Sequence, residues 1–479
     1  MTLSKLVWNS FVFGYGTLVL PAFLLLAFIR KPNFRRLNAE DKKELVAARE
    51  RLWNLERQPF GLHHRFCVLR CGAKLHYVES IQREQTSTSN LVIFMHGYPD
   101  SYALWKRYLQ NPRLATRATL IAVDLPGFGG SDSMDRYGPA EVMEAITEFI
   151  LKMREKYVSD DNSSSSSSSS RVVVVAHDWG AMVGFRLAAE APQLADHFIL
   201  GNCIHPPLAV SNVKTRLASA GQMVRTWLRS PLKVRLLRRA FRNITPLLRQ
   251  LVKSGYVFVF NLPFPMANLI GHVGDYWWFR YLNAVSTHPD PPKPLSGVHG
   301  AELLAGSVGP SLRECPTALK DSELTYSDSV RRRARTGGFQ DKISFYRHGL
   351  AFAPWEKSLE ALWELDQLQQ RKGRQRSASC AAIFDTGPEG SLQAPTTVIW
   401  GKGDVAIENA IALEGFRDYF GVKNSQVVVV SDCGHWSPLE KQGAPIFENA
   451  IEWAVEGGKV SLRNKLGNNY PMAQITSER

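Results

Sequence analysis

The stretch of sequence that decides the fold is Arg171-Val-Val-Val-Val-Ala-His-Asp178-Trp-Gly180-Ala-Met182. Its four consecutive valines predict a buried strand, because a parallel strand covered on both faces carries a continuous apolar run. The run ends at Asp178, and residues 181–190 predict a helix. Small residues at Ala176 and Gly180 would allow a sharp turn between strand and helix, which pushes the Asp178 side chain outward as in a nucleophile elbow.

A carboxylate at this turn indicates a particular chemistry. An aspartate nucleophile forms an ester with an alkyl carbon, which differs from ordinary ester cleavage by serine. The alternative interpretation is structural, since aspartate is also a favourable N-cap residue at the start of a helix. The rest of the chain has to decide between the two.

Length and composition predict one large α/β domain with additions. The chain has 479 residues, of which 44% are hydrophobic and 21% charged, so it can bury a large core. Its six cysteines are scattered without a CxxC pair, which argues against a disulfide framework or a zinc site. The glycines that follow Asp124 do not have the GxGxxG spacing of a dinucleotide site. We therefore expect neither a metal nor a cofactor.

The net charge of +14 is concentrated in one segment. Residues 211–274 contain eleven Lys or Arg residues and no Asp or Glu. Between Lys214 and Lys253 the basic residues interleave with apolar ones at roughly helical spacing, which favours contact with anionic lipid headgroups. A solvated helical face is the alternative. Nucleic-acid binding is not expected, because no helix-turn-helix, finger or RNA-binding signature is present.

The N-terminal stretch predicts a membrane anchor. Residues 6–29 contain no charged residue in 24 positions, which is enough to span a bilayer as a helix. The stretch is too long for a typical signal-peptide core and no small-x-small cleavage pattern follows, although a cleaved signal or a buried helix stays an alternative. Four basic residues follow it within 30–36, against Lys5 alone before it, and the positive-inside rule then places the body in the cytosol. We expect a single-pass protein of the endoplasmic reticulum, with the lipid droplet as the other possible membrane.

The remaining sequence predicts a mostly parallel sheet with helices on both faces and one interruption. Apolar strand patterns stop after Pro207, where a helical region that is first basic and then aromatic predicts an inserted cap. The predicted organisation is an anchor at 1–37 with its helix at about 6–29, a core at 60–206, a helical cap at 207–350, the second part of the core at 351–460, and a C-terminal tail at 461–479. Surface loops are predicted for the eight serines at 163–170 and for the polar stretch 369–393. The strand at 425–431 is predicted to be the last, and the chain is predicted to be loose from Asn464 onward.

Three side chains follow predicted strand ends in an informative order. Asp178, Asp404 and His435 each lie just past a strand, and ligands of an open parallel sheet collect at this edge. Nucleophile, acid and histidine occur in the chain order of the α/β-hydrolase fold. Asp404 would orient the imidazole of His435, and His435 would act as the base. The set of three favours the catalytic interpretation over the structural one.

The chain resembles an α/β-hydrolase of the epoxide hydrolase group, which is related to haloalkane dehalogenases. The motifs that carry the resemblance spread over residues 60–460; they are His96-Gly-Tyr-Pro-Asp100, Asp124-Leu-Pro-Gly-Phe-Gly-Gly-Ser131, His177-Asp-Trp-Gly180, Trp400-Gly-Lys-Gly-Asp404 and Gly434-His-Trp436. The sequence departs from the family pattern at Ala176, where glycine is commoner, and in the two predicted loops, which look like insertions.

The resemblance implies a two-step mechanism on a lipophilic epoxide and water. Asp178 would form the alkyl ester, water activated by His435 would hydrolyse it, and the backbone N–H groups of Tyr98 and Trp179 would bind the oxyanion. Two tyrosines of the cap would protonate the opened epoxide. Tyr346 is expected to be one of them, since Phe345-Tyr-Arg347 resembles the family segment, and Tyr276 is preferred over Tyr281 for the second.

Two other functions stay open from the sequence. A haloalkane dehalogenase would use the same triad, but Tyr98 stands where many dehalogenases carry Asn, and a tyrosine at 346 suits protonation of oxygen better than binding of halide. A membrane-tethered scaffold with an inactive hydrolase body is the alternative from another class, and the intact triad argues against it.

Overall fold

The computed structural model describes residues 3–29, 36–80, 90–158, 170–272, 274–287, 295–375 and 387–479. Of the serine tract that predicts a loop, only Ser170 is among the described residues. Residues 376–386 of the second predicted loop also lie outside them.

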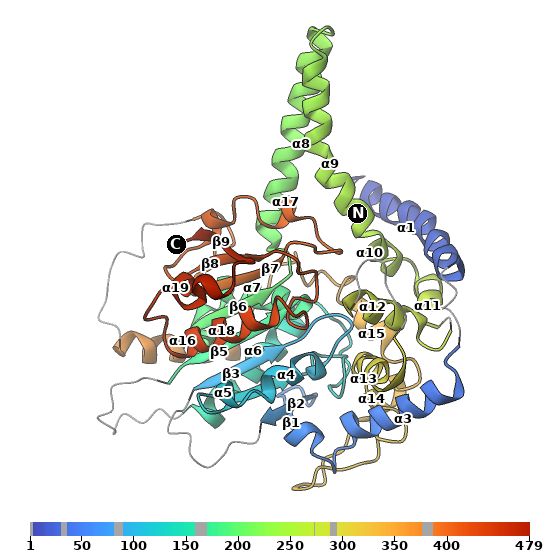
Figure 1. Cartoon of the computed structure of the whole chain (residues 1–479), viewed down its shortest axis with the longest axis vertical. Coiled ribbons are helices and arrows are strands. Elements are labelled where there is room, and N and C mark those ends of the chain that lie inside the picture. Colours follow the sequence, from blue (N-terminus) through green and yellow to red (C-terminus); the bar gives the residue numbers. More distant parts are fainter. Residues whose placement is uncertain are drawn as a thin grey trace.

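A nine-stranded, mostly parallel sheet forms the centre of the molecule (Figure 1), in the order β1-β2-β4-β3-β5-β6-β7-β8-β9. The pairs from β4 to β8 are parallel, while β1 with β2, β2 with β4, and β8 with β9 are antiparallel. The strands are β1 (Leu62–Val68), β2 (Lys74–Ser80), β3 (Leu91–Met95), β4 (Thr119–Val123), β5 (Val172–His177), β6 (His197–Gly201), β7 (Thr396–Gly401), β8 (Gln426–Val430) and β9 (Ala473–Glu478). The predicted fold class, a mostly parallel sheet with helices on both faces, is confirmed.

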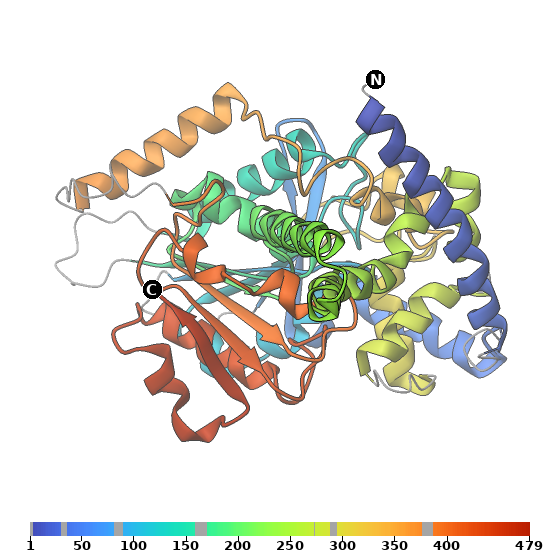
Figure 2. The ribbon, with the colours of Figure 1, turned by 90° about the horizontal axis from the view of Figure 1, so that it is seen from above.

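Helices cover both faces of the sheet, which explains the apolar run of β5. All four of its valines are fully buried, because β5 lies between β3 and β6 with a helix layer on either side. One layer contains α4 (Lys106–Leu109), α5 (Pro112–Ala115) and α18 (Ala444–Val455); the other contains α6 (Pro139–Tyr157), α7 (Trp179–Glu190) and α16 (Leu359–Gln375) (Figure 2).

Among the described residues, eight helices besides α16 lie between β6 and β7, where the sequence predicts an inserted region. They are α8 (Pro206–Arg229), α9 (Val234–Lys253), α10 (Gly255–Phe260), α11 (Phe264–His272), α12 (Trp277–Thr287), α13 (Gly297–Val308), α14 (Asp328–Arg333) and α15 (Phe339–Ser344). Helices α8 and α9 form an antiparallel hairpin that projects far from the body, whereas α10 to α15 pack over one end of the sheet (Figure 1).

Two expectations about the C-terminal half are wrong. The chain end is not loose, because β9 pairs antiparallel with β8, and the strand at 425–431 is therefore not the last. The short helices α17 (Asn409–Ala412) and α19 (Leu462–Leu466) precede β9 in the chain. The stretch 369–393 is not a loop throughout, because α16 continues to Gln375. Both segments are polar enough to look irregular, but β9 completes the hydrogen bonds of a sheet edge and α16 packs against α6.

The N-terminal helix α1 (Leu3–Ile29) is followed by α3 (Ala39–Trp53), which packs on α13. Within the described residues, α1 is long and apolar enough to cross a membrane over Leu6–Leu25. One side of α1 packs against α10. Seen along the projecting hairpin, α1 lies over the inserted helices and its outer side is uncovered (Figure 2). One N-terminal apolar helix is therefore a candidate membrane anchor.

Candidate active site

Asp178 lies at the turn between β5 and α7 with a strained backbone. Its φ of 49° and ψ of −120° are unusual for a residue other than glycine. Such strain costs on the order of 1–3 kcal/mol and persists where the surrounding structure enforces it. The side chain keeps 15% of its exposed surface, so the carboxylate is accessible although the strand before it is buried.

Two glycines make room for this turn. A Cβ on Gly180 would lie 2.5 Å from the carbonyl oxygen of His96, so α7 could not start so close to the end of β3. A Cβ on Gly97 would lie 2.5 Å from Cβ of Asp178. The segments around residues 96 and 178 therefore pack in direct contact. Each segment needs a glycine at the point where it meets the other.

His435 and Asp404 come from the loops after β8 and β7. The Nδ1 of His435 lies 2.8 Å from an Asp404 carboxylate oxygen, and its Nε2 lies 3.7 Å from Oδ1 of Asp178. Asp404 in turn accepts hydrogen bonds from the backbone N–H groups of Ala406 (2.7 Å) and Ile407 (2.8 Å). The structure thus brings the three residues of the predicted triad together at the carboxyl edge of the sheet.

Asn202 is a supporting residue that the sequence reasoning missed. Its side-chain amide donates to Asp404 Oδ2 at 2.7 Å, and its own oxygen accepts from the N–H of Gly401. Asn202 follows β6 with a positive φ of 42°. The signal that could have identified it is its position, because it is the polar residue directly after a buried strand adjacent to β7.

A predicted oxyanion donor contacts the other oxygen of Asp178, Oδ2. The backbone N–H of Tyr98 donates to Oδ2 of Asp178 at 2.7 Å, and the N–H of Trp179 also hydrogen-bonds this carboxylate. Oδ1 is left facing His435. The two carboxylate oxygens are therefore distinguished by their surroundings, because Oδ1 lies toward His435 and Oδ2 accepts from Tyr98.

Burial and charge set the protonation of the triad. Burial raises the pKa of Asp178 above its ordinary value, against the lowering effects of His435 and the two N–H groups. Burial opposes charge on Asp404 as well, but the His435 imidazole beside it lowers the pKa of that carboxyl. For His435, burial lowers the pKa, yet Asp404, its hydrogen bond and the charge of Asp178 together raise the pKa to about 9.

Two tyrosine side chains from the inserted region lie close to the turn that carries Asp178. The ring of Tyr346, which follows α15, packs edge-on against Trp179 with a centroid distance of 4.8 Å. Its hydroxyl hydrogen-bonds that of Tyr256, which lies on α10, and the two rings are edge-on with a centroid distance of 5.9 Å. Burial raises the pKa of both tyrosines, so that they stay protonated and can donate.

The structure places Tyr276 elsewhere, which corrects the expectation for the second donor. Its hydroxyl accepts from the Arg49 guanidinium at 3.4 Å, in the contact between α3 and the inserted helices. Tyr281, the other candidate, stacks on Trp277 with a centroid distance of 5.9 Å. Tyr256 is the tyrosine that lies beside Tyr346, and the sequence offered little to identify it because it begins the apolar run Tyr-Val-Phe-Val-Phe260.

Other buried polar groups hold the loops of the site. His177 Nε2 lies 2.7 Å from the carbonyl oxygen of His435, and Trp436 donates to Asp100 at 3.1 Å. The Tyr98 hydroxyl accepts from the Trp278 indole N–H at 2.8 Å. Burial first, and then the charge of Asp178, raise the pKa of Asp100 to about 7, although the Trp436 hydrogen bond opposes this. The loop that carries the Tyr98 N–H is therefore fixed at both ends.

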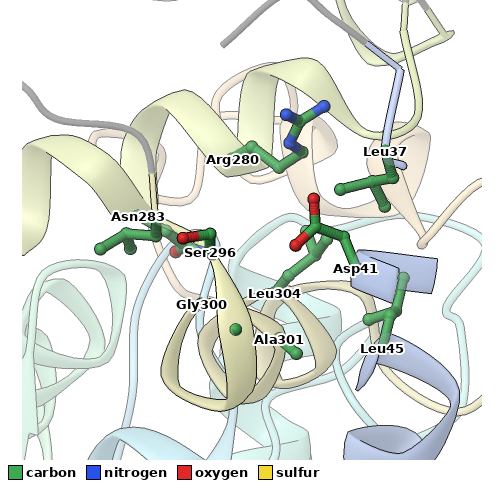
Figure 3. Close-up of a pocket in the computed structure, with 11 residues that line it drawn as sticks. Leu37, Asp41, Leu45, Arg280, Asn283, Ser296, Gly300, Ala301 and Leu304 are labelled. Carbon is green, nitrogen blue, oxygen red and sulfur yellow. The ribbon is translucent and has the colours of Figure 1, made fainter. Parts of the chain in front are cut away.

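A cavity between α3, α12 and α13 lies apart from this constellation (Figure 3). Arg280 and Asp41 face each other across it, and none of the triad or donor residues lines it. Among the residues that the structure describes, no group of three or more His, Cys, Asp and Glu side chains could hold a metal ion.

The chain belongs to the α/β hydrolase family, since the family described as "Alpha/beta hydrolase family" matches residues 92–448. This match includes all three triad residues and both tyrosines that face Asp178. It also includes the inserted helices, so the interruption between β6 and β7 lies within the family region.

Three curated proteins show the range of relatives. Epoxide hydrolase 3 of Mus musculus is 24% identical over 409 residues, which cover 83% of this chain and 80% of that protein. Epoxide hydrolase 2 of Caenorhabditis elegans is 28% identical over 147 residues, covering 30% and 36%. A haloalkane dehalogenase of Sphingobium indicum is 31% identical over 132 residues, covering 28% and 38%. The chain spans only about a third of the length of the last two relatives.

Proposed function

We propose that this protein hydrolyses a lipophilic epoxide to a vicinal diol through an alkyl ester on Asp178. The observation that carries the proposal is the position of the Asp178 carboxylate between three kinds of partner: two backbone N–H donors, the His435 imidazole, and the paired hydroxyls of Tyr346 and Tyr256. The similarity to epoxide hydrolase 3 over most of the chain supports the same substrate class.

In the first step, Oδ1 of Asp178 attacks an epoxide carbon and the carbon–oxygen bond of the ring breaks. The leaving oxygen becomes an alkoxide, which takes a proton from Tyr346 or Tyr256. Burial raises the pKa of Asp178 and limits the solvation of its carboxylate, while His435 and the N–H donors oppose this shift and favour the ionised form that attacks. The protonated tyrosines are suited to theirs because burial keeps their pKa high.

In the second step, His435 takes a proton from water, which attacks Cγ of the ester. The negative charge then develops on Oδ2, the oxygen that the Tyr98 N–H already binds at 2.7 Å. Ester formation neutralises Asp178 and so removes one cause of the high pKa of His435. The imidazole becomes easier to deprotonate at the stage where a base is required. When the Cγ–Oδ1 bond breaks, Oδ1 leaves as a hydroxyl oxygen of the diol and takes the proton from His435. The second proton of the water, left on the carboxyl group of Asp178, returns to the tyrosinate, so that the starting state is restored.

The test of this function compares an epoxide with a haloalkane. Purified full-length protein is given styrene oxide or 1-chlorobutane, and diol and chloride release are measured. We expect diol without chloride, and we expect Tyr256→Phe to slow diol formation about tenfold or more, as for loss of one transition-state hydrogen bond. Tyr276→Phe is the matched control, since its hydroxyl faces Arg49, and should change the rate less than about twofold.

Chloride release without diol would instead support the haloalkane dehalogenase, which the Sphingobium relative keeps as the second candidate. The presence of two tyrosine hydroxyls near Asp178 favours the epoxide, because they protonate an oxygen. If the folded protein releases neither diol nor chloride, the result would support the inactive scaffold.

We further propose that α1 attaches the protein to a membrane, with the catalytic body on the cytosolic side of the endoplasmic reticulum. The outer side of α1 supports attachment, because it exposes large apolar side chains of Leu6, Val7, Trp8, Phe13, Leu18, Leu25 and Phe28. The basic flank after α1 supports the orientation. Protection of the body from protease in sealed microsomes would contradict it.

The hairpin of α8 and α9 supports a second membrane contact. Its apolar side chains Leu228, Leu232, Val234, Leu237 and Phe241 are exposed, with Leu232 at the tip 97% exposed. Basic residues surround them without an acidic residue in 211–274. Exposed apolar groups among basic ones are the surface that an anionic bilayer binds.

Neutralising the hairpin should weaken binding to anionic vesicles selectively. The triple variant Arg238→Gln, Arg239→Gln and Arg242→Gln removes three exposed charges, each contributing about 1 kcal/mol at such a surface. We expect the ratio of affinities for vesicles with and without phosphatidylserine to fall by about 10²-fold. The control, Arg331→Gln, Arg332→Gln and Arg335→Gln near α14, should leave this ratio unchanged; an equal effect of both triples would contradict the proposal.

A further inference from the structure

Helix α1, the candidate membrane anchor, packs against the short helix α10, which carries Tyr256. Helix α10 has only six residues, Gly255 to Phe260, and so short a helix has no stable position of its own. Its position depends on the elements that pack against its two sides. One side carries Tyr256 and Phe260, one turn apart, and faces the active site.

The opposite side of α10 is covered by α1. The ring of Phe258 lies edge-on between Phe11 and Tyr15, with centroid distances of 5.8 Å and 4.8 Å. The hydroxyl of Tyr15 donates to the carbonyl oxygen of Leu251 at 3.2 Å, in the last turn of α9, which leads into α10. Farther along α1, the Phe23 ring packs edge-on against Trp278, whose indole N–H binds the Tyr98 hydroxyl.

The two helices approach each other closely at Gly16. A Cβ placed there would lie 2.6 Å from the backbone oxygen of Phe258, so α1 and α10 can meet only because residue 16 has no side chain. Gly14, two residues earlier in α1, faces open space, where a Cβ would meet no atom of the described residues within 4 Å. The inner face of α1 thus fits α10 specifically, while its outer face is the apolar one that remains exposed.

We propose that α1 is a positioning element of the active site, which holds α10 so that Tyr256 reaches the opened epoxide. The chain of contacts runs from Gly16 to Phe258, through the six-residue helix to Tyr256, and from Tyr256 to Tyr346. Displacement of a catalytic group by about 1 Å can cost 10²-fold in rate. Docking of α1 therefore sets the rate of epoxide opening, and the membrane anchor and the catalytic donor act as one unit. This inference rests on the proposed function.

The experiment compares Gly16→Leu with Gly14→Leu in the full-length protein, in the same detergent and with styrene oxide as the probe. Both changes add the same apolar side chain to α1 and raise its helix propensity equally. Single-turnover kinetics separate formation of the Asp178 ester from its hydrolysis. We expect Gly16→Leu to slow ester formation about tenfold or more, with ester hydrolysis within twofold of wild type, and Gly14→Leu to change neither.

A double variant shows whether the effect passes through Tyr256. In the Tyr256→Phe background, Gly16→Leu should change ester formation less than twofold, because the donor that α1 positions is already absent. A tenfold effect that persists in this background, or equal effects of the two glycine variants, would overturn the inference. Should Gly16→Leu not fold, Gly16→Ala against Gly14→Ala makes the same comparison with one methyl group. If Tyr256→Phe alone forms the ester at the wild-type rate, the proposed role of Tyr256 as a donor is wrong. This outcome is distinct from a failure of the inference about α1.

Discussion

Asp178→Ala should abolish diol formation from styrene oxide, with a loss of about 10⁴-fold or more, because the variant lacks the carboxylate that forms the alkyl ester. The strained turn supports this size of effect. Its φ of 49° places the carboxylate between the donors of Tyr98 and Trp179, and a water molecule at this position could not form a covalent intermediate. Diol release is measured by chromatography at saturating substrate.

An isotope experiment on the wild-type protein identifies the same residue directly. In a single turnover in water enriched in oxygen-18, the label should enter the carboxylate of Asp178 and not the diol, since water attacks Cγ and the diol leaves with Oδ1. Mass spectrometry of the peptide that contains residue 178 reads the result. Asp432→Asn is the control variant for Asp178→Ala, because Asp432 is a carboxylate outside the triad, three residues before His435. Diol formation that persists in Asp178→Ala would refute the nucleophile.

His435→Gln should stop turnover after the first step and leave the alkyl ester on Asp178. The base for ester hydrolysis is then missing, while Oδ1 and the tyrosine donors are retained, so ester formation continues. Loss of a general base costs about 10²–10⁴-fold. We expect one equivalent of ester per protein, detected as a mass increase equal to that of the epoxide.

The pH dependence of the wild-type protein gives a second measurement of His435. The imidazole has a pKa of about 9 while Asp178 is charged, and this pKa falls when the ester removes that charge. Ester hydrolysis should therefore rise with pH through a midpoint below 9. His299→Gln, which changes an exposed histidine on α13, is the control and should show neither ester accumulation nor an altered profile. Continued diol formation by His435→Gln would contradict the role of His435 as the base.

Local sequence patterns were sufficient for the centre of the molecule. The valines of β5 are apolar on both faces because both faces are covered, and this is visible without any other element. Asp404 and His435 could be located for a similar reason. Each follows a buried strand, and parallel strands bring their carboxyl ends to one edge.

Segments whose role depends on a distant partner were the ones misjudged. The alternating polar residues of β9 become a strand because β8 presents an unpaired edge, and α16 extends into a polar stretch because it packs on α6. Tyr276 and Tyr256 are both aromatic residues in the inserted helices. Only the packing of α10 against the loop of Tyr346 decides that Tyr256 faces Asp178 while Tyr276 faces Arg49.

The sequence by itself determined the parallel sheet, the turn that presents Asp178 and the order of the triad, because each depends on contacts between near neighbours or on the uniform geometry of strands. The tertiary structure alone decided which tyrosines approach Asp178, that Asn202 supports Asp404, and that one face of α1 covers α10. Those contacts join residues far apart in the chain, Gly16 and Phe258 among them, and no local pattern records which surface a side chain meets after folding.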